Sequence, residues 1–297
     1  MANHAFDSFI LGQVSLDINV DHQGNTIYET GGAVVYSSYA ASALGHSVCV
    51  LPKADKAMEL EEVFARGENI TLIPLASPHG TSIKNIFHTA DKERRTCRAI
   101  SRIDPYKVEE IPDIDAAIYH VAGLMKGDLN NDIIIHAAKK ALAAVDVQCL
   151  LRCVKDEDGE MEFVDWEEKR EILPYIEFLK TDAAEAEILT GMKDREAAAK
   201  LLHEWGAKEV MITHNTEVLV FDGVNMYSQP LKPRNISGRS GRGDTCFSSY
   251  ITERLHTGIP EALHMAAALV SHKMENPGPF LGSREDILAY MRTYYDK

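Results

Sequence analysis

The chain has 297 residues, of which 45% are hydrophobic and 26% are charged, and these proportions are typical of a globular protein rather than a disordered one. Its 45 acidic residues outnumber its 31 basic residues, and the resulting net charge of −14 argues against nucleic acid as a partner. The sequence has no apolar segment long enough to span a membrane and no features of a signal peptide near its first residue. Because its five cysteines form no C-x-x-C pair, we expect reduced thiols and a cytoplasmic protein.

Short apolar runs alternate with stretches of helical periodicity along the chain. We expect strands at residues 9–11, 48–51, 116–121, 178–179 and 210–213, and helices at residues 33–44, 59–66, 132–144 and 196–205. This alternation is typical of a parallel sheet with helices on both faces. The length suits one domain over residues 1–297, which we expect to be a doubly wound, mostly parallel α/β fold.

Two segments interrupt this alternation. Residues 16–30 and 82–100 each alternate apolar and polar side chains about a polar turn, which for the second segment is residues 90–93. Both patterns predict β-hairpins. Since neither hairpin has an obvious place in a doubly wound sheet, we expect a small lid, about residues 13–30 and 80–102, over the sheet edge where such folds bind ligands. Two surface hairpins without a role are the alternative.

A glycine-rich loop at residues 238–243 precedes an amphipathic stretch that ends at Leu255. Gly241 and Gly243 let the backbone approach a ligand closely, because they carry no Cβ. A helix that starts here would direct unpaired N–H groups and the positive end of its dipole at an anion. Asp244, at the start of that helix, is either an ordinary N-cap or a base that accepts a proton. The second interpretation indicates phosphoryl transfer to a hydroxyl.

Three motifs in register resemble those of the ribokinase/PfkB family of small-molecule kinases. Residues 241–244, with the sequence G-R-G-D, match the end of the family's D-T-x-G-A-G-D signature, whose first half is absent. Residues 31–45 resemble its G-G-x-x-x-N-x-A…L-G segment, with Tyr36 in place of Asn. Residues 182–191 resemble its N-x-x-E-x-E-x-L-T-G segment, with Asp182 in place of the first Asn. The resemblance implies a ribokinase-like fold with a β-lid, and an ATP- and Mg²⁺-dependent kinase.

The resemblance also implies a role for individual residues. The catalytic residues would be Asp244, Gly241, Arg242 and Gly243; the acceptor would contact Asp17, Gly31, Gly32, Tyr36, Gln148 and Arg152; the nucleotide would contact Thr213, Asn215, Arg239, Asn276 and Gly278; and Asp182 and Glu185 would hold the metal. Asp244 would act as the general base, beside backbone N–H groups that stabilise the transferred phosphoryl group. Asp182 and Glu185 would hold Mg²⁺ mostly through water, although a solvated acidic helix start is the alternative for this pair.

Several residues leave the identity of the acceptor undecided. Asp146 and Gln148, followed by Arg152, are similar to a pattern of myo-inositol kinases in the family, but an Asp at the end of a strand is also a routine helix cap. Tyr36 in place of Asn changes the size and the hydrogen bonding of a sugar pocket. The basic residues 94–98 are either a solvated strand or a clamp for a phosphate that the acceptor already carries.

We therefore expect a kinase that phosphorylates a hydroxyl of an unphosphorylated sugar or cyclitol, such as inositol. A nucleoside kinase and a sugar-phosphate kinase are the alternatives within this class. A regulatory protein that binds a nucleotide or sugar without catalysis is the alternative from another class. The expected partner is a small molecule, with neither nucleic acid nor membrane, and the lid offers a surface for a homodimer.

Overall fold

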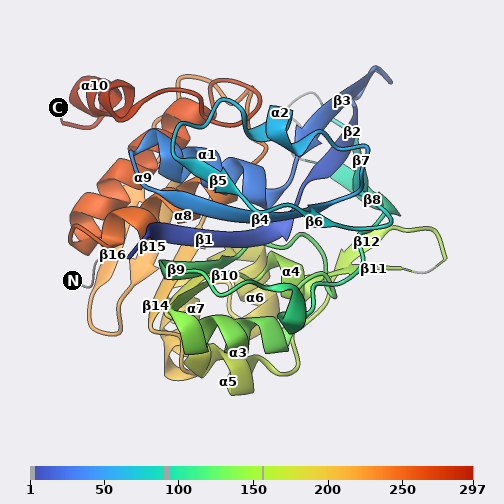
Figure 1. Cartoon of the computed structure of the whole chain (residues 1–297). Coiled ribbons are helices and arrows are strands. Elements are labelled where there is room, and N and C mark those ends of the chain that lie inside the picture. Colours follow the sequence, from blue (N-terminus) through green and yellow to red (C-terminus); the bar gives the residue numbers. More distant parts are fainter. Residues whose placement is uncertain (1–3, 90–93, 156, 297) are drawn as a thin grey trace.

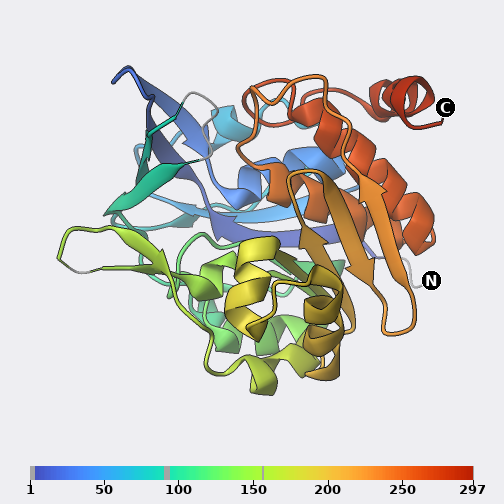
Figure 2. The same ribbon diagram turned by 180° about the vertical axis from the view of Figure 1, so that it is seen from behind.

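A twisted ten-stranded sheet forms the centre of the described chain (Figure 1). The computed structural model describes residues 4–89, 94–155 and 157–296. In spatial order the strands are β16 (Met226–Pro230), β15 (Glu217–Phe221), β14 (Glu209–Thr213), β13 (Phe178–Asp182), β10 (Leu142–Asp146), β9 (Ala116–Val121), β1 (Phe6–Gln13), β4 (Val48–Ala54) and β5 (Ile70–Leu72), and β6 (Leu75–Ala76) also pairs with β4. Neighbours from β14 to β5 are parallel, whereas β15 and β16 add an antiparallel edge, drawn in orange in Figure 2. The predicted mostly parallel α/β fold is confirmed.

Helices cover both faces of this sheet. One face carries α1 (Ala33–Ala43), α2 (Leu60–Phe64), α8 (Arg242–Arg254), α9 (Ile259–Lys273) and α10 (Arg284–Tyr294), and the other carries α3 (Asn131–Lys140), α4 (Gln148–Leu151), α5 (Lys169–Ile172), α6 (Ala183–Thr190) and α7 (Arg195–Glu204), with 3-10 turns at Val108–Glu110 and Leu173–Tyr175. The central strands are apolar and buried on both sides, as parallel strands between two helix layers are. Among the described helices, no stretch is both long and apolar enough to cross a membrane.

One predicted helix is too long. The helix expected at residues 132–144 ends at Lys140, and the chain from Leu142 forms strand β10. The last turn of this helix carries two lysines, Lys139 and Lys140, and a helix C-terminus is where the dipole favours cations. Ala143 and Ala144 are good helix formers, but they are buried between strands β9 and β13, where a small apolar side chain fits a two-sided strand.

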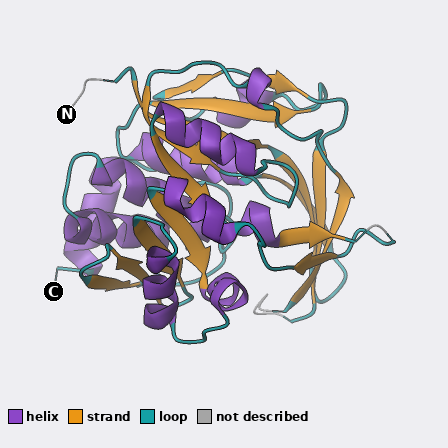
Figure 3. Cartoon of the chain, turned by 90° about the horizontal axis from the view of Figure 1, so that it is seen from below, coloured by secondary structure: helices purple, strands orange, loops and turns teal. Residues whose placement is uncertain are grey.

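A second sheet stands at the end of the molecule away from both termini (Figure 3). It consists of β3 (Thr26–Gly31), β2 (Ser15–Val20), β7 (Thr81–Phe87) and β8 (Arg95–Ser101), in this order. The two predicted hairpins are present as the antiparallel pairs β2–β3 and β7–β8, and β2 joins them by parallel pairing with β7. The predicted turn at residues 90–93 lies outside the described residues. That this sheet closes over a ligand stays a prediction.

A further hairpin was not predicted. Strands β11 (Arg152–Val154) and β12 (Met161–Phe163) pair with each other, and Glu160 forms a bridge with Arg98 of β8. This hairpin therefore lies beside the second sheet, and it places Arg152 near that sheet.

Candidate active site

Three parallel strands end on a polar residue at one edge of the main sheet. Strand β10 ends at Asp146, β13 at Asp182 and β14 at Thr213, and Asp182 pairs in register with Thr213. Strand β1 ends at Gln13 on the same edge, and β2 of the second sheet begins two residues later. The carboxyl edge of a parallel sheet is where such folds bind ligands. The predicted site residues therefore come from several strands to one edge.

The glycine loop reaches this edge at the start of α8. Gly241 is the N-cap of α8 and has a φ of 72°, in the left-handed region that favours glycine. A Cβ on Gly241 would overlap the ring of Tyr36, so the tyrosine packs directly against the loop. Asp244 is the third residue of the helix and not its cap, and the capping alternative for Asp244 is therefore wrong.

The N–H groups at the start of α8 are not all equally available. The N–H of Arg242 donates to the carbonyl of Arg239 at 3.2 Å, so this predicted donor is already used within the loop. The N–H of Gly243 has no acceptor among the described residues. The first N–H groups of a helix lack intrahelical partners, and the free N–H of Gly243 is thus a donor for an anion.

Lys180 of β13, which was not predicted as a site residue, lies directly beside this helix start. Its Nζ donates to Oδ2 of Asp146 at 2.8 Å, and it lies 2.9 Å from the position that a Cβ on Gly243 would take. The side chain is 5% exposed. Burial alone would lower the pKa of Lys180, but the carboxylates of Asp146 and Glu185 outweigh burial and raise it. Lys180 therefore carries its charge next to the anion site.

A second buried lysine, also not predicted, holds the glycine loop in place. Nζ of Lys273, at the end of α9, donates to the carbonyl of Gly238 at 2.5 Å and to that of Ser240. The same ammonium lies 5.0 Å from the centre of the Tyr36 ring, within the range of a cation–π contact. Burial lowers the pKa of Lys273 to about 8.

Asp244 lies among these charges. Burial and repulsion from Asp146 raise the pKa of Asp244 to about 6, although Lys180, Arg152 and Lys273 oppose this change. A carboxylate whose pKa lies near neutral pH can both accept a proton and release it. The position and the ionisation of Asp244 therefore suit a general base.

The residues predicted for the acceptor form two groups. In the first group, a Cβ on Gly31 would lie 2.6 Å from Oδ2 of Asp17, and one on Gly32 would overlap the carbonyl of Gln13. With a φ of 109°, Gly32 also needs to be glycine. The hydroxyl of Ser15 donates to Oδ1 of Asp17 at 2.8 Å. The glycine pair thus lets β3 approach Asp17 closely.

The second acceptor group is linked to Lys180 through one carboxylate. The guanidinium of Arg152 donates to Oε1 of Gln148 at 2.9 Å, and the N–H of Gln148 donates to Oδ1 of Asp146 at 3.0 Å. The other oxygen of Asp146 accepts from Lys180. Asp146 therefore connects the predicted acceptor side with the anion site.

The basic residues of the second sheet fall into two environments. Arg98 pairs with Asp158 at 3.4 Å, which is an ion pair between β8 and the turn of the β11–β12 hairpin. Arg95 is exposed, and its charge acts on Asp17 and on Arg152. Burial raises the pKa of Asp17, and the cations Arg95 and Arg152 oppose that shift. Arg95 is thus near enough to the acceptor side to act on it electrostatically.

The residues predicted for the nucleotide are only partly brought together. Oδ1 of Asn215 accepts from Arg239 at 3.2 Å and from Arg242 at 2.7 Å, so these three form one group. Asn276 lies on the other side of the loop, where a Cβ on Gly238 would overlap its carbonyl.

The other two residues predicted for the nucleotide, Thr213 and Gly278, belong neither to the group around Asn215 nor to the contact at Asn276. Thr213 is 3% exposed, and its hydroxyl donates to the carbonyl of Thr181 at 3.5 Å. Gly278 has a φ of 79°, and a Cβ on it would meet open space. Its turn conformation alone therefore accounts for the glycine.

The predicted metal ligands are paired at the start of α6. Oδ1 of Asp182 accepts from the N–H of Glu185, and Oε2 of Glu185 accepts from the N–H of Asp182, both at 2.8 Å. Glu185 is 2% exposed, so a fully solvated acidic helix start is not what the structure contains. Burial and the nearby Asp182 raise the pKa of Glu185 to about 7. Each side chain keeps one carboxylate oxygen outside the capping box, and this set fits a hydrated Mg²⁺ ion.

Comparison with known proteins supplies the context for this geometry. The sequence profile of the pfkB family carbohydrate kinases matches residues 28–283. A cytidine kinase from Thermococcus kodakarensis is 25% identical over 256 residues, which cover 82% of this chain and 87% of that protein. A solved structure of a pyrophosphate-dependent kinase in the ribokinase family, complexed with a pyrophosphate analogue and myo-inositol, is 32% identical with a TM-score of 0.87, and the match covers 95% of this chain and 99% of that one.

A ribokinase of Arabidopsis thaliana, solved with ribose and ATP, is 15% identical with a TM-score of 0.75 over 97% of this chain and 99% of that one. This likeness concerns the fold. Together with the preceding structure it confirms the predicted ribokinase-like fold.

Proposed function

Since the chain belongs to the pfkB family of carbohydrate kinases, we propose that it transfers a phosphoryl group from pyrophosphate to a hydroxyl of a cyclitol, with myo-inositol as the first candidate. The observation that carries the kinase chemistry is the position of Asp244. Its carboxyl group, with a raised pKa, lies at the same helix start as the free N–H of Gly243 and the ammonium of Lys180. A base, an anion site and a counter-charge are the parts that phosphoryl transfer requires.

The reaction follows from these positions. Asp244, deprotonated, accepts the proton of the acceptor hydroxyl, and the hydroxyl oxygen forms a bond to the terminal phosphorus of the donor. The bond between that phosphorus and the bridging oxygen breaks, and orthophosphate leaves when the donor is pyrophosphate. The N–H of Gly243 and the ammonium groups of Lys180 and Lys273 stabilise the negative charge on the phosphoryl oxygens.

Mg²⁺ belongs to this proposal as a cofactor held by Asp182 and Glu185. When bound, the ion supplies positive charge to the phosphate oxygens. Burial, together with repulsion from Asp182 and Asp146, raises the pKa of Glu185, and a nearby cation would favour its charged form.

Two observations favour pyrophosphate over ATP as the donor. The solved kinase that is 32% identical to this chain is pyrophosphate-dependent. The loop at residues 274–279, which carries the predicted nucleotide residues Asn276 and Gly278, packs against the glycine loop, since the N–H of Gly238 donates to the carbonyl of Met274 at 2.7 Å. A compact anion such as pyrophosphate needs cations but no pocket for a nucleobase. Arg239 belongs to the glycine loop, and Lys180 and Lys273 lie close to it. The predicted ATP remains the second donor to test.

Two classes of acceptor compete. The structure complexed with myo-inositol favours a cyclitol, and so do the acidic Asp17 and the polar pair Gln148–Arg152, which suit several hydroxyl groups. The 25% identity to a cytidine kinase favours a nucleoside as the second candidate.

The proposal is tested with purified protein, Mg²⁺ and every pairing of two donors with several acceptors. The donors are pyrophosphate and ATP, and the acceptors are myo-inositol, ribose, fructose 6-phosphate and cytidine. We expect a phosphomonoester of myo-inositol in the ³¹P NMR spectrum, with pyrophosphate as the better donor. A phosphoester of cytidine alone would support the nucleoside kinase, and the absence of any phosphoester from every pairing would overturn the kinase proposal.

We place this reaction in the cytoplasm. The five cysteines are free thiols in the structure, as expected in a reducing compartment. A homodimer through the second sheet is a further part of the proposal, because the edge strand β3 exposes Ile27 and Tyr28, at 59% and 66%. Light scattering of the wild-type protein and of Tyr28→Ser tests this point, and a wild-type mass of one chain would contradict it.

A further inference from the structure

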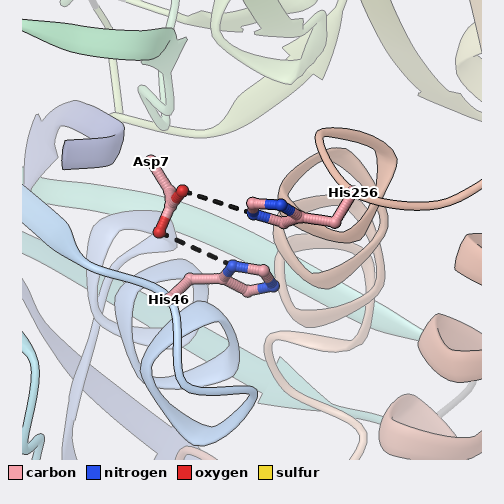
Figure 4. A group of neighbouring side chains, drawn as sticks. All are labelled: Asp7, His46 and His256. Carbon is pink, nitrogen blue, oxygen red and sulfur yellow. Dashed lines mark ion pairs between the residues drawn. The ribbon is translucent and has the colours of Figure 1, made fainter. Parts of the chain in front are cut away.

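Three side chains with metal-ligating atoms meet at the opposite edge of the main sheet from the glycine loop (Figure 4). Asp7 is the second residue of β1, His46 lies between α1 and β4, and His256 lies two residues beyond the end of α8. Nδ1 of His46 is 3.6 Å from Oδ2 of Asp7, and Nε2 of His256 is 3.4 Å from Oδ1 of Asp7. Both imidazole rings therefore direct a nitrogen at the same carboxylate.

The spacing of these atoms is close to that of a metal site. One ligand atom from each of the three residues lies within 4.8 Å of the other two. Zinc binds imidazole nitrogen and carboxylate oxygen at about 2.0–2.2 Å, which places tetrahedral ligand atoms roughly 3.4 Å apart. His256 is half exposed, whereas His46 is buried. His256 is therefore the ligand whose side chain is in contact with solvent and has room to adjust when an ion binds.

The residues around the cluster hold its ligands in the orientation that a metal needs. Nε2 of His46 lies 2.8 Å from Oε1 of Glu253, and Glu253 accepts from both terminal nitrogens of Arg284, at 2.6 and 2.9 Å. In the neutral tautomer whose Nε2–H donates to Glu253, Nδ1 has the lone pair that faces Asp7 and can bind a metal. Oδ2 of Asp7 accepts from the N–H and the hydroxyl of Ser47, at 2.8 and 3.1 Å. A carboxylate against the second ring nitrogen, as Glu253 is here, usually orients a metal-ligating histidine.

We propose that Asp7, His46 and His256 bind a divalent transition metal, with Zn²⁺ as the first candidate. Two imidazoles and a carboxylate with an open side suit Zn²⁺, whereas Mg²⁺ and Ca²⁺ prefer oxygen ligands alone. The ion joins the start of β1, the connection from α1 to β4 and the far end of α8, whose near end carries Asp244. The site is independent of the kinase chemistry proposed above.

Without a metal, the same contacts have another explanation. A protonated His46 between the carboxylates of Asp7 and Glu253 balances the cluster, with Arg284 as a second cation on Glu253 and the His256 ring stacked on His46 at 5.3 Å. Such a cluster needs no ion. Binding of Zn²⁺ separates the two explanations.

Isothermal titration of the full chain with ZnCl₂, after treatment with a chelator, tests the proposal. We expect one Zn²⁺ per chain in the wild-type protein and at least tenfold weaker binding in His256→Ala. The matched control is His79→Ala, which removes an exposed histidine far from the cluster in the sequence and should bind as the wild type does. Mg²⁺ should not compete, since it avoids nitrogen ligands.

Two further measurements keep the result clear. Zn²⁺ should raise the melting temperature of the wild type and of His79→Ala but not that of His256→Ala, because a ligand stabilises only the state that binds it. Co²⁺ in place of Zn²⁺ should give the visible absorption bands of a low-symmetry nitrogen and oxygen site, and Asp7→Asn should lose them. Absence of binding to the wild type, or equal binding to wild type and His256→Ala, would overturn the metal site without affecting the kinase proposal.

Discussion

Each of the two edges of the main sheet holds a cluster of acidic and basic side chains, but the pKa values of the carboxylates shift in opposite directions at the two edges. At the amino edge, hydrogen bonds from His46 and Arg284 outweigh burial and hold the pKa of Glu253 at about 2. At the carboxyl edge, burial raises the pKa of Asp244 to about 6, and that of Glu185 to about 7. One edge therefore stabilises its carboxylates as anions, and the other makes them easier to protonate.

The difference lies in how the cations are shared. Glu253 has hydrogen bonds to a cation or an imidazole on both of its oxygens. The ammonium of Lys180 instead donates a hydrogen bond to Asp146. Lys180 lowers the pKa of Asp244 through its charge. Carboxylates with satisfied hydrogen bonds contribute stability, whereas those with raised pKa values are typical of functional sites. The direction of the shift thus distinguishes the two clusters.

The largest expected effect comes from Asp244→Asn, which removes the proposed base. The amide cannot accept the proton of the acceptor, so kcat should fall by about two to four orders of magnitude. The melting temperature should hold or rise slightly, because the change removes repulsion from Asp146. Steady-state kinetics and thermal unfolding measure both quantities, with Asp104→Asn, an exposed acid, as the control. Turnover near that of the wild type would show that Asp244 is not the base.

At the amino edge, Glu253→Gln should act on stability instead. Replacing the carboxylate weakens its hydrogen bonds with His46 and Arg284 and should cost roughly 1.5–3 kcal/mol of unfolding free energy. The wild type should lose this contribution as the pH falls from about 4.5 towards 2, since the folded pKa is the lower one. Urea denaturation at several pH values measures this loss, which should be smaller in the variant. A variant with wild-type stability at pH 7 would show that the cluster does not stabilise the fold.

The pH dependence of kcat/KM tests the carboxyl edge. The expected effect is smaller, because kcat/KM should change by at most tenfold per pH unit. The base acts when deprotonated, so kcat/KM should rise with pH through about 6. Lys273 loses its charge through about 8, so the rate should fall above that pH. Lys273→Arg keeps its charge and should remove the alkaline limb. A profile without an acidic limb would contradict the raised pKa of Asp244.

The smallest effect is expected from the basic residues of the second sheet. Replacing Arg94, Arg95 and Arg98 together by Ser should leave KM for the cyclitol nearly unchanged, because Arg98 pairs with Asp158 and Arg95 is exposed. Lys193→Ser, at a side chain that is 86% exposed, is the control. If these arginines instead hold an acceptor phosphate, each lost charge-assisted bond should cost roughly 1.5–3 kcal/mol. A large rise in KM would therefore favour a sugar-phosphate kinase.

The sequence was most informative where neighbouring residues act together. The helix at residues 33–44 and the start of α8 were predicted well. A run of small residues indicates the first, and a glycine-rich loop before an amphipathic stretch indicates the second. Strand β10 was assigned partly to a helix, since alanines are also common in helices. Nothing in the neighbouring residues indicates that they are buried on both faces of a sheet. Elements at the sheet edge, such as β15 and β16, were not predicted.

The site was predictable in its motifs and not in its two buried lysines. Asp244 and the capping pair Asp182–Glu185 lie within recognisable segments. Lys180 directly follows the apolar strand residues Phe178 and Leu179, and a lysine within a buried strand is the one signal that could have marked it as paired. Lys273 ends a helix, where a lysine is ordinary, and only its bonds to the glycine loop distinguish it. Asp7 and His256 are far apart in the chain, so their meeting depends entirely on the fold.

The contact between Gly241 and Tyr36 restricts the order in which substitutions can accumulate. Because the tyrosine ring occupies the space of a Cβ at position 241, any larger residue there would have to follow a smaller residue at position 36. Even then the φ of 72° would disfavour it. Position 36 is therefore free to change first and position 241 is not, so a library that redesigns acceptor preference should vary Tyr36 and leave Gly241 constant.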